Sequence, residues 1–137
     1  MLQFASIVPV LRVADVARSA SWYQEILGFS AELTPAVAPH AACRLRRDDT
    51  ELLLRRVTGP AAPGKMPSRE GWDVLLRLRG DALVALLDEA RRRTPLVRGP
   101  EIMPDGNVEF ELEDPDGHRV CVAEVLSDTR GIPRAII

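Results

Sequence analysis

The chain has 137 residues, which suits one compact domain or two half-size units that share a core. Its hydrophobic content of 46% is enough for a packed interior, and its net charge of −2 leaves no basic excess to neutralise nucleic-acid phosphates. No apolar run approaches the roughly 20 residues that span a bilayer. The first 13 residues lack the pattern of a secretory signal, and Cys43 and Cys121 form no CxxC motif. We therefore expect a cytoplasmic protein with reduced thiols that binds neither nucleic acid nor membrane.

The first half predicts a strand, a helix and three further strands. An alternating strand is expected over 7–13, where Pro9 marks an edge or a bulge because it has no N–H to donate. Asp15 is expected to cap a helix over 16–27, and Gly28 to end that helix in a left-handed conformation. A short strand and a hairpin complete this half, at 30–33, 41–46 and 51–57.

The second half predicts the same order. A strand over 72–78 precedes a helix over 82–93, for which Asp81 is the expected N-cap. A short strand near 96–98 and a final hairpin follow, and the Pro-Asp-Gly run in the hairpin is a typical turn. The two hairpin strands are expected at 107–113 and 119–124.

The two halves therefore form an internal repeat. An offset of 65 residues maps the two opening strands on each other, and an offset of about 67 maps Leu54 on Cys121. An isolated half would leave one sheet face exposed, so the halves should pair. The sequence predicts an α+β fold of tandem βαβββ modules. The first module, linker, second module and C-terminal tail are expected at 1–57, 58–71, 72–126 and 127–137.

Three motifs occur in order on this repeat. The first is the opening P-x-L-x-V-x-D of Pro9 to Asp15, and the second is Trp22-Tyr23 followed by Leu27-Gly28-Phe29. The third is Glu109-Phe110 followed by Asp114-Pro115-Asp116-Gly117-His118. Together they resemble the vicinal oxygen chelate superfamily of glyoxalase and bleomycin-resistance-like proteins. The resemblance implies paired modules whose curved sheets enclose a cleft, and commonly a homodimer.

The resemblance also implies where a metal would be held. Metal-dependent members place one ligand on the first and one on the last strand of each module, which here gives Val8, Leu54, Asp73 and Cys121. Val8 and Leu54 have no ligating atom. Asp73 and Cys121 pair a hard carboxylate with a soft thiol, and a catalytic ion usually needs three or four ligands. We therefore expect no catalytic metal and no other cofactor.

Further residues are candidates for ligand binding. Arg12 and Arg77 share predicted strand faces with Val8 and Asp73, so they could pair with an anionic ligand. Trp72 could stack on a planar ligand or pack at the edge of the core. Asp73 could act as a base, bind a cation or form a salt bridge with a nearby arginine. Cys121 is either a nucleophile or, in the plainer interpretation, a buried thiol.

Two functional hypotheses follow from these residues. The first is a metal-independent binding protein, similar to bleomycin-resistance proteins, that sequesters an antibiotic or related small molecule in a dimer cleft. An aromatic content of only 4% argues against bleomycin itself as the ligand. The second is an enzyme of the same superfamily, a lyase, isomerase, dioxygenase or transferase with a shifted metal site. The four substituted ligand positions favour binding.

Overall fold

The computed structural model describes residues 1–58 and 71–136. The chain divides into two compact units, Met1–Gly64 and Lys65–Ile137. The boundary falls within the predicted linker of residues 58–71, most of which (59–70) lies outside the described residues. The elements run β, α, β, β, β in each unit, which confirms the predicted α+β fold of tandem βαβββ modules.

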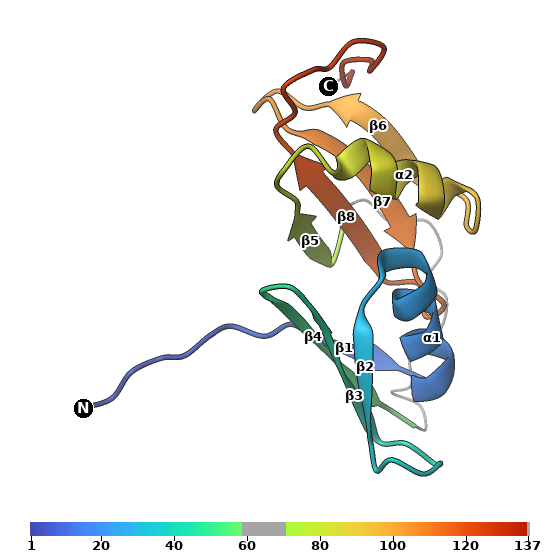
Figure 1. Ribbon diagram of the computed structural model, residues 1–137. Coiled ribbons are helices and arrows are strands. Elements are labelled where there is room, and N and C mark those ends of the chain that lie inside the picture. The colour runs from blue at the N-terminus through green and yellow to red at the C-terminus, as the bar shows by residue number, and fades with distance from the viewer. Residues whose placement is uncertain (59–70, 137) are drawn as a thin grey trace. The chain divides into compact units, whose positions relative to one another are not determined.

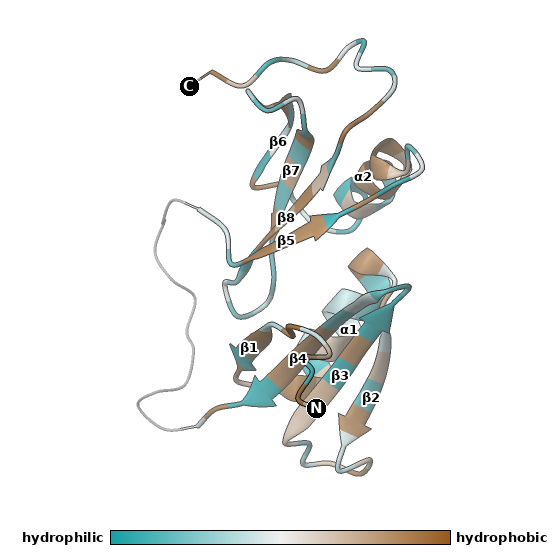
Figure 2. Ribbon diagram, turned by 90° about the vertical axis from the view of Figure 1, so that its left-hand side faces the viewer, coloured by the Kyte–Doolittle hydropathy of each residue, from teal (hydrophilic) through white to brown (hydrophobic). Residues whose placement is uncertain are grey.

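The first unit is a four-stranded sheet with one helix against one of its faces (Figure 1). The strand order is β1-β4-β3-β2, with β1 parallel to β4 and the other pairs antiparallel. Its elements are β1 (Val10–Val13), α1 (Val16–Leu27), β2 (Ser30–Thr34), β3 (Ala42–Arg47) and β4 (Thr50–Arg56). Apolar and polar residues alternate along β3, as the changes of colour along the strand in Figure 2 show, so one face of this strand is apolar and buried.

The start of β1 differs from the predicted strand over 7–13. Pairing begins at Val10, because Pro9 has no N–H for the ladder, although its carbonyl oxygen still accepts a hydrogen bond from the Leu53 amide at 3.0 Å. The helix that follows agrees with the prediction at both ends. The Asp15 side chain accepts from the Arg18 amide at 3.1 Å, and Gly28 ends the helix with φ of 70°.

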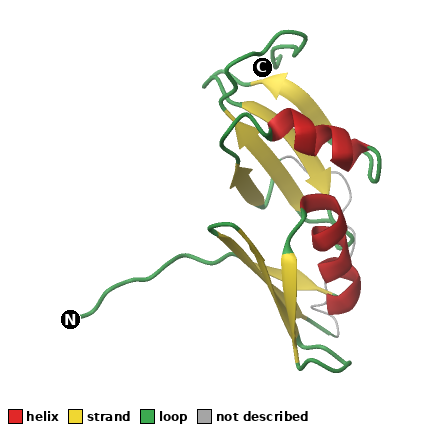
Figure 3. Ribbon diagram, viewed as in Figure 1, coloured by secondary structure: helices red, strands yellow, loops and turns green. Residues whose placement is uncertain are grey.

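The second unit repeats the architecture. Its strand order is β5-β8-β7-β6, again with one parallel pair, β5 with β8, and two antiparallel pairs. One helix covers one face of the sheet, and the described part of the chain has no helix long and apolar enough to span a membrane (Figure 3). Its elements are β5 (Val74–Arg77), α2 (Leu83–Arg91), β6 (Arg98–Ile102), β7 (Val108–Glu113) and β8 (Arg119–Glu124).

The start of α2 corrects one prediction. Asp81 does not cap the helix: it has φ of 56°, and its carboxylate accepts instead from the Ser127 amide and hydroxyl at 3.0 and 2.6 Å. The cap comes from Glu124 at the end of β8. Its carboxylate accepts from the backbone amides of Asp81, Ala82 and Leu83 at 2.6, 2.8 and 2.9 Å. A distant strand thus supplies the acceptor that a local side chain was expected to give.

The pairing register also corrects the repeat by one residue. Leu11 lies opposite Leu54 in the first sheet, and Leu76 lies opposite Val122 in the second. The offset between the last strands is therefore 68 residues, if the opening strands are aligned at 65. Leu54 corresponds to Val122, and the counterpart of Cys121 is Leu53. Since side chains alternate along a strand, Leu54 lies on the face of its sheet opposite to the one that the predicted repeat implied.

Candidate functional site

The two faces of the second sheet differ sharply in chemistry. Val120 and Val122 of β8 and Phe110 of β7 point toward α2, are fully buried and form the core with the helix. Glu124 shares that face, as its bonds to the start of α2 show. The opposite side is called here the open face. Its residues form three rows across the strands: Arg77, Ala123, Glu109 and Glu101; Leu75, Cys121, Glu111 and Arg98; and Asp73, Arg119 and Glu113.

A bulge in β6 aims two charged side chains at the open face. Arg98 pairs with Glu111 and Glu101 pairs with Glu109, so β6 uses three steps where β7 uses two. Gly99, between them, has φ of 86°, and a Cβ there would run into the backbone oxygen of Glu109 and the Cα of Phe110. Only glycine suits this position. The bulge therefore brings Arg98 and Glu101 to the same face.

Arg98 is the centre of a cluster of carboxylates. Its guanidinium donates to Glu101 at 2.6 Å, to Glu109 at 2.9 Å and to Glu111 at 3.0 Å. Glu109 and Glu111 are 9% and 4% exposed, so two of these acids are buried against their partner. Burial opposes the charge on Arg98, but the hydrogen bonds to the three acids outweigh it and raise the pKa of Arg98. The guanidinium thus stays charged and fixes the acids in place.

Cys121 lies beside this cluster and is a thiol at neutral pH. Its sulfur accepts a long contact from the Arg98 guanidinium at 3.8 Å, and its side chain is fully buried. Burial, followed by the charge of Glu109, raises the pKa of Cys121 to about 12, although Arg98 acts in the opposite direction. Because a thiolate is the nucleophile and the metal ligand, the environment disfavours both chemistries.

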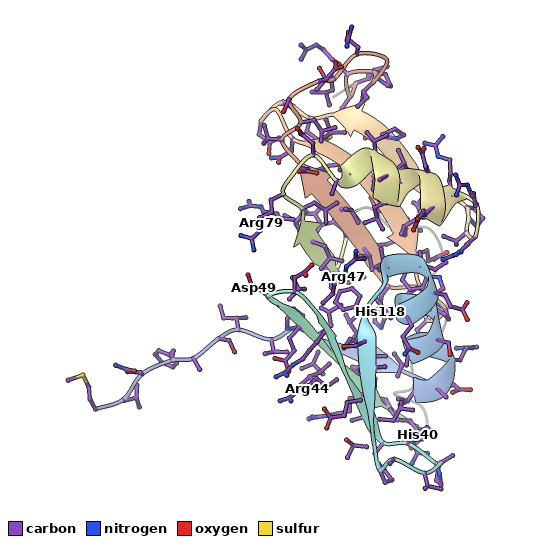
Figure 4. The ribbon with its side chains drawn as sticks, in the orientation of Figure 1. His40, Arg44, Arg47, Asp49, Arg79 and His118 are labelled. Carbon is purple, nitrogen blue, oxygen red and sulfur yellow. The ribbon has the colours of Figure 1, made fainter. Side chains whose placement is uncertain are left out.

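The third row is also charged. Asp73 accepts a hydrogen bond from the Arg119 amide at 2.8 Å, and its carboxylate lies 3.9 Å from the His118 ring in the turn before β8 (Figure 4). The Arg119 guanidinium lies 3.6 Å from Glu113 and 3.8 Å from Glu111. Asp73 is thus tied to the start of β8 by a backbone contact.

The residues at the expected ligand positions do not fit a metal of the kind that the resemblance implies. In the described ranges, no three His, Cys, Asp or Glu side chains are placed so that they could hold an ion. Cys121 keeps its proton, Asp73 is engaged with β8, and Arg98 already supplies a cation to the carboxylates. Val8 and Leu54 belong to the first unit and offer no donor atom.

The remaining candidate residues of the first unit lie on different surfaces. Leu54 is fully buried and shares its face with Leu11 in the core beneath α1. Arg12 is exposed on the opposite face, where Arg44 also projects and forms an ion pair with Glu51 at 2.8 Å (Figure 4). Val8 precedes β1 and is half-buried.

In the second unit, three of the candidates share one surface. The structure brings Asp73, Arg77 and Cys121 together on the open face, one in each row. Trp72 directly precedes them and is 45% exposed. Sequence reasoning missed Arg98, Glu101 and the role of Glu109 and Glu111. The strict alternation of acids along β7 was a usable signal for Glu109 and Glu111. Nothing in the sequence indicated the bulge that turns Arg98 and Glu101 of β6 to the same face.

Comparisons with known proteins agree with this architecture. A family model described as Glyoxalase/Bleomycin resistance protein/Dioxygenase superfamily matches residues 3–122. The crystal structure of TioX from Micromonospora sp. ML1 has a TM-score of 0.71 at 17% identity, over 90% of this chain and 100% of that one. No curated protein sequence matches the chain.

Two further solved structures represent the two functional classes. The bleomycin-binding protein from bleomycin-producing Streptomyces verticillus, complexed with copper(II)-bleomycin, has a TM-score of 0.57 at 21% identity, over 93% of this chain and 100% of that one. Lactoylglutathione lyase from Agrobacterium tumefaciens has a TM-score of 0.65 at 17% identity, over 88% and 92%. At these identities the likeness concerns the fold, which binding proteins and enzymes share.

Proposed function

The chain belongs to the glyoxalase/bleomycin resistance protein/dioxygenase superfamily, and on that premise we propose that it is a metal-independent small-molecule-binding protein. The ligand is held on the open face of the second sheet, and an antibiotic or related compound is the class we favour. The observation that carries this proposal is the Arg98 cluster. There a side chain of the protein, rather than an ion, supplies the positive charge to Glu101, Glu109 and Glu111.

The charge of the open face supports a binding role. Five carboxylates and three guanidinium groups occupy its eleven positions, and the face is a sheet surface rather than a loop. Charged side chains at such density are costly to cover with an apolar layer, since each needs hydrogen-bonding partners. A polar ligand can supply those partners. The excess of acids favours ligands that carry a cationic group.

The same face gives little support to catalysis. Cys121 is held as a thiol, so it is a poor nucleophile, and Arg98 and Arg119 hold Glu111 between them. A general base needs an acceptor that can reach the substrate proton. Asp73 is the candidate base that the sequence indicated, and its carboxylate already accepts from the Arg119 amide.

We also propose that the protein acts as a homodimer in the cytoplasm. The segment before β1 runs out from the first unit, and its apolar side chains Leu2, Phe4 and Ile7 are 81%, 95% and 96% exposed (Figure 1). A second copy that covers these side chains would remove apolar surface from water. The two unpaired buried thiols, Cys43 and Cys121, suit a reducing compartment. Light scattering during gel filtration measures the mass, and a monomer at all concentrations would contradict the dimer.

Ligand-induced changes in the melting temperature test the binding function. The panel contains divalent Ni, Zn, Mn and Fe, bleomycin with and without copper(II), and mitomycin, because a ligand that binds only the folded state raises its stability. We expect a drug, and no metal alone, to stabilise the protein. Stabilisation by a metal alone would instead support an enzyme of the same superfamily with a shifted metal site.

A pair of matched variants localises the binding. Asp73→Asn removes one charge from the open face but keeps an oxygen for the Arg119 amide, whereas Asp88→Asn removes one charge from the exposed surface of α2. We expect Asp73→Asn to weaken binding of the stabilising drug and Asp88→Asn to leave it unchanged. Equal effects of the two variants would contradict a site on the open face.

A further inference from the structure

A pocket of about 560 Å³ lies at the end of the second sheet, where β5 and β8 lead into the segments that follow them. Its volume is in the range of small-molecule sites. The polar residues that line it are Arg77, Arg79, Asp81, Asn107, Glu124 and Ser127. All of them belong to the second unit, so the pocket is complete within that unit. Only Arg77 is part of the site proposed above.

The two carboxylates of the pocket are already satisfied by the protein. Glu124 accepts from three backbone amides at the start of α2, at 2.6 to 2.9 Å, where the helix end carries a partial positive charge. Asp81 accepts from the amide and hydroxyl of Ser127, and these hydrogen bonds lower the pKa of Asp81. Both acids therefore have their charge offset by fixed donors and offer little to a ligand cation.

The donors that the pocket offers to a ligand come from two arginine side chains. Arg77 lies opposite Ala123, and both residues line the pocket. Arg79 follows two residues later, and Figure 4 shows its side chain projecting from the segment after β5. Asn107 lines the same pocket, and its side chain is hydrogen-bonded to Asp105. The two guanidinium groups match the paired oxygens of a carboxylate or phosphate.

One nearby carboxylate competes for Arg77. The pKa of Asp105 is lowered first by the hydrogen bond from the Asn107 amide and last by the charge of Arg77. The Asp105 carboxylate accepts from that amide at 2.9 Å and is exposed to solvent. Water screens an exposed pair, so an anion in the pocket can displace this interaction at low cost.

The turn that follows the two arginines is held in place. Gly80 has φ of 85° and Asp81 has φ of 56°, and the two bonds from Ser127 tie this turn to the chain after β8. A preformed site loses less conformational entropy when a ligand binds.

We propose that this pocket binds the anionic group of a small molecule, a carboxylate or a phosphate, with Arg77 and Arg79 as its binding residues. The inference does not depend on the function proposed above, because a cationic drug would bind to the carboxylates of the open face, whereas an anion would bind to the guanidinium groups of this pocket. A ligand with both charges could bridge the two.

Titration of the ¹⁵N-labelled full chain with inorganic phosphate or sodium acetate tests the proposal, with sodium chloride keeping the ionic strength constant. We expect saturable shifts of the amides of Gly80, Asn107 and Ser127. Saturation by phosphate alone assigns a phosphorylated ligand, and saturation by acetate alone or by both assigns a carboxylate as sufficient. If neither anion saturates these shifts, the proposal is wrong.

Variants separate a built site from general charge attraction. Arg77→Gln/Arg79→Gln should weaken anion binding about tenfold or more, since each lost charge-assisted hydrogen bond is substantial. Arg91→Gln, on the exposed end of α2, should leave it unchanged. Asp105→Asn keeps an acceptor for the Asn107 amide and removes the competing charge, so it should strengthen binding by roughly two- to fivefold. Unchanged binding in the double variant, with the rest of its spectrum intact, would overturn the proposal.

Discussion

Arg98 shows how one residue can determine the character of a surface. Its side chain is 28% exposed, yet it holds three carboxylates, two of them buried. Without it, Glu109 and Glu111 would face each other on adjacent rows with no cation between them. Like charges at this spacing in a region of low dielectric constant repel strongly.

We predict that Arg98→Met destabilises the second unit by about 2 to 3 kcal/mol. The usual cost of breaking a buried ion pair is discounted here, because the guanidinium is partly solvated. Urea unfolding measures the change. Arg130→Met is the control, since Arg130 pairs with Asp128 at 2.7 Å but is 91% exposed, and we expect no measurable effect.

A second substitution tests the cause of that loss. Glu111→Gln in the Arg98→Met chain removes one uncompensated charge, so it should restore part of the stability. In the wild-type chain the same substitution should destabilise. A double-mutant cycle gives the coupling between the two residues, and additive effects would show that the cluster is not electrostatically linked.

Cys121 predicts a response to alkaline pH. Folding raises the pKa of this thiol from 9.0 to about 12, so the unfolded chain releases its proton first as the pH rises. The associated stability is present in full below pH 9 and is lost between pH 9 and about 12. Cys121→Ala should therefore lose less stability than wild type when urea unfolding is compared at pH 8 and pH 11. Parallel losses would contradict the burial of the thiol.

The β6 strand depends on a single glycine, Gly99, at its bulge. In Gly99→Ala the new methyl group would collide with the Glu109 backbone, at a φ that alanine disfavours. We predict a loss of at least about 3 kcal/mol, measured by urea unfolding. Gly106→Ala is a matched control: its φ is 89°, but nothing lies within 4 Å of the new Cβ. There we expect about 1 kcal/mol, and equal losses would argue against the close contact.

The α2 helix depends on a carboxylate from another element. Glu124→Ala would leave three buried or partly buried amides without an acceptor, at a cost of about 2 to 3 kcal/mol. Glu124→Gln keeps an acceptor and should cost about 1 kcal/mol. Hydrogen exchange at Asp81, Ala82 and Leu83 should accelerate in both variants. Glu89→Ala on the exposed face of α2 should change neither quantity.

The contrast between the two helices explains what sequence could predict at this scale. The ends of α1 were predicted correctly, because Asp15 and Gly28 act on amides and carbonyls within one turn of themselves. The N-cap of α2 was predicted wrongly, because the acceptor for the Leu83 amide is Glu124, which lies 41 residues further along the chain. Local chemistry can be read along a sequence, whereas a contact between distant elements needs the register of the sheet.

For the whole molecule, the repeat made the fold predictable and limited the prediction of the site. The βαβββ order and both hairpins follow from alternation and turn residues, and the structure confirms them. An error of one residue in the repeat aligned Leu54 with Cys121. In the structure Leu54 lies on the face of its sheet that packs against α1, whereas Cys121 lies on the open face of the second sheet. Asp73, Arg77 and Cys121 lie on one face of the second sheet, because they belong to β5, β8 and the residue just before β5.

The buried thiols give this chain a means of reporting on each half separately. Cys43 is 1% exposed in the first unit and Cys121 is fully buried in the second. A thiol reagent can reach each sulfur only when its own unit opens, so the two labelling rates measure two opening equilibria in one sample. Because each unit has a core beneath its own helix, we expect different rates in rising urea, resolved by mass spectrometry of the two peptides. Identical rates at every urea concentration would mean that the halves open together.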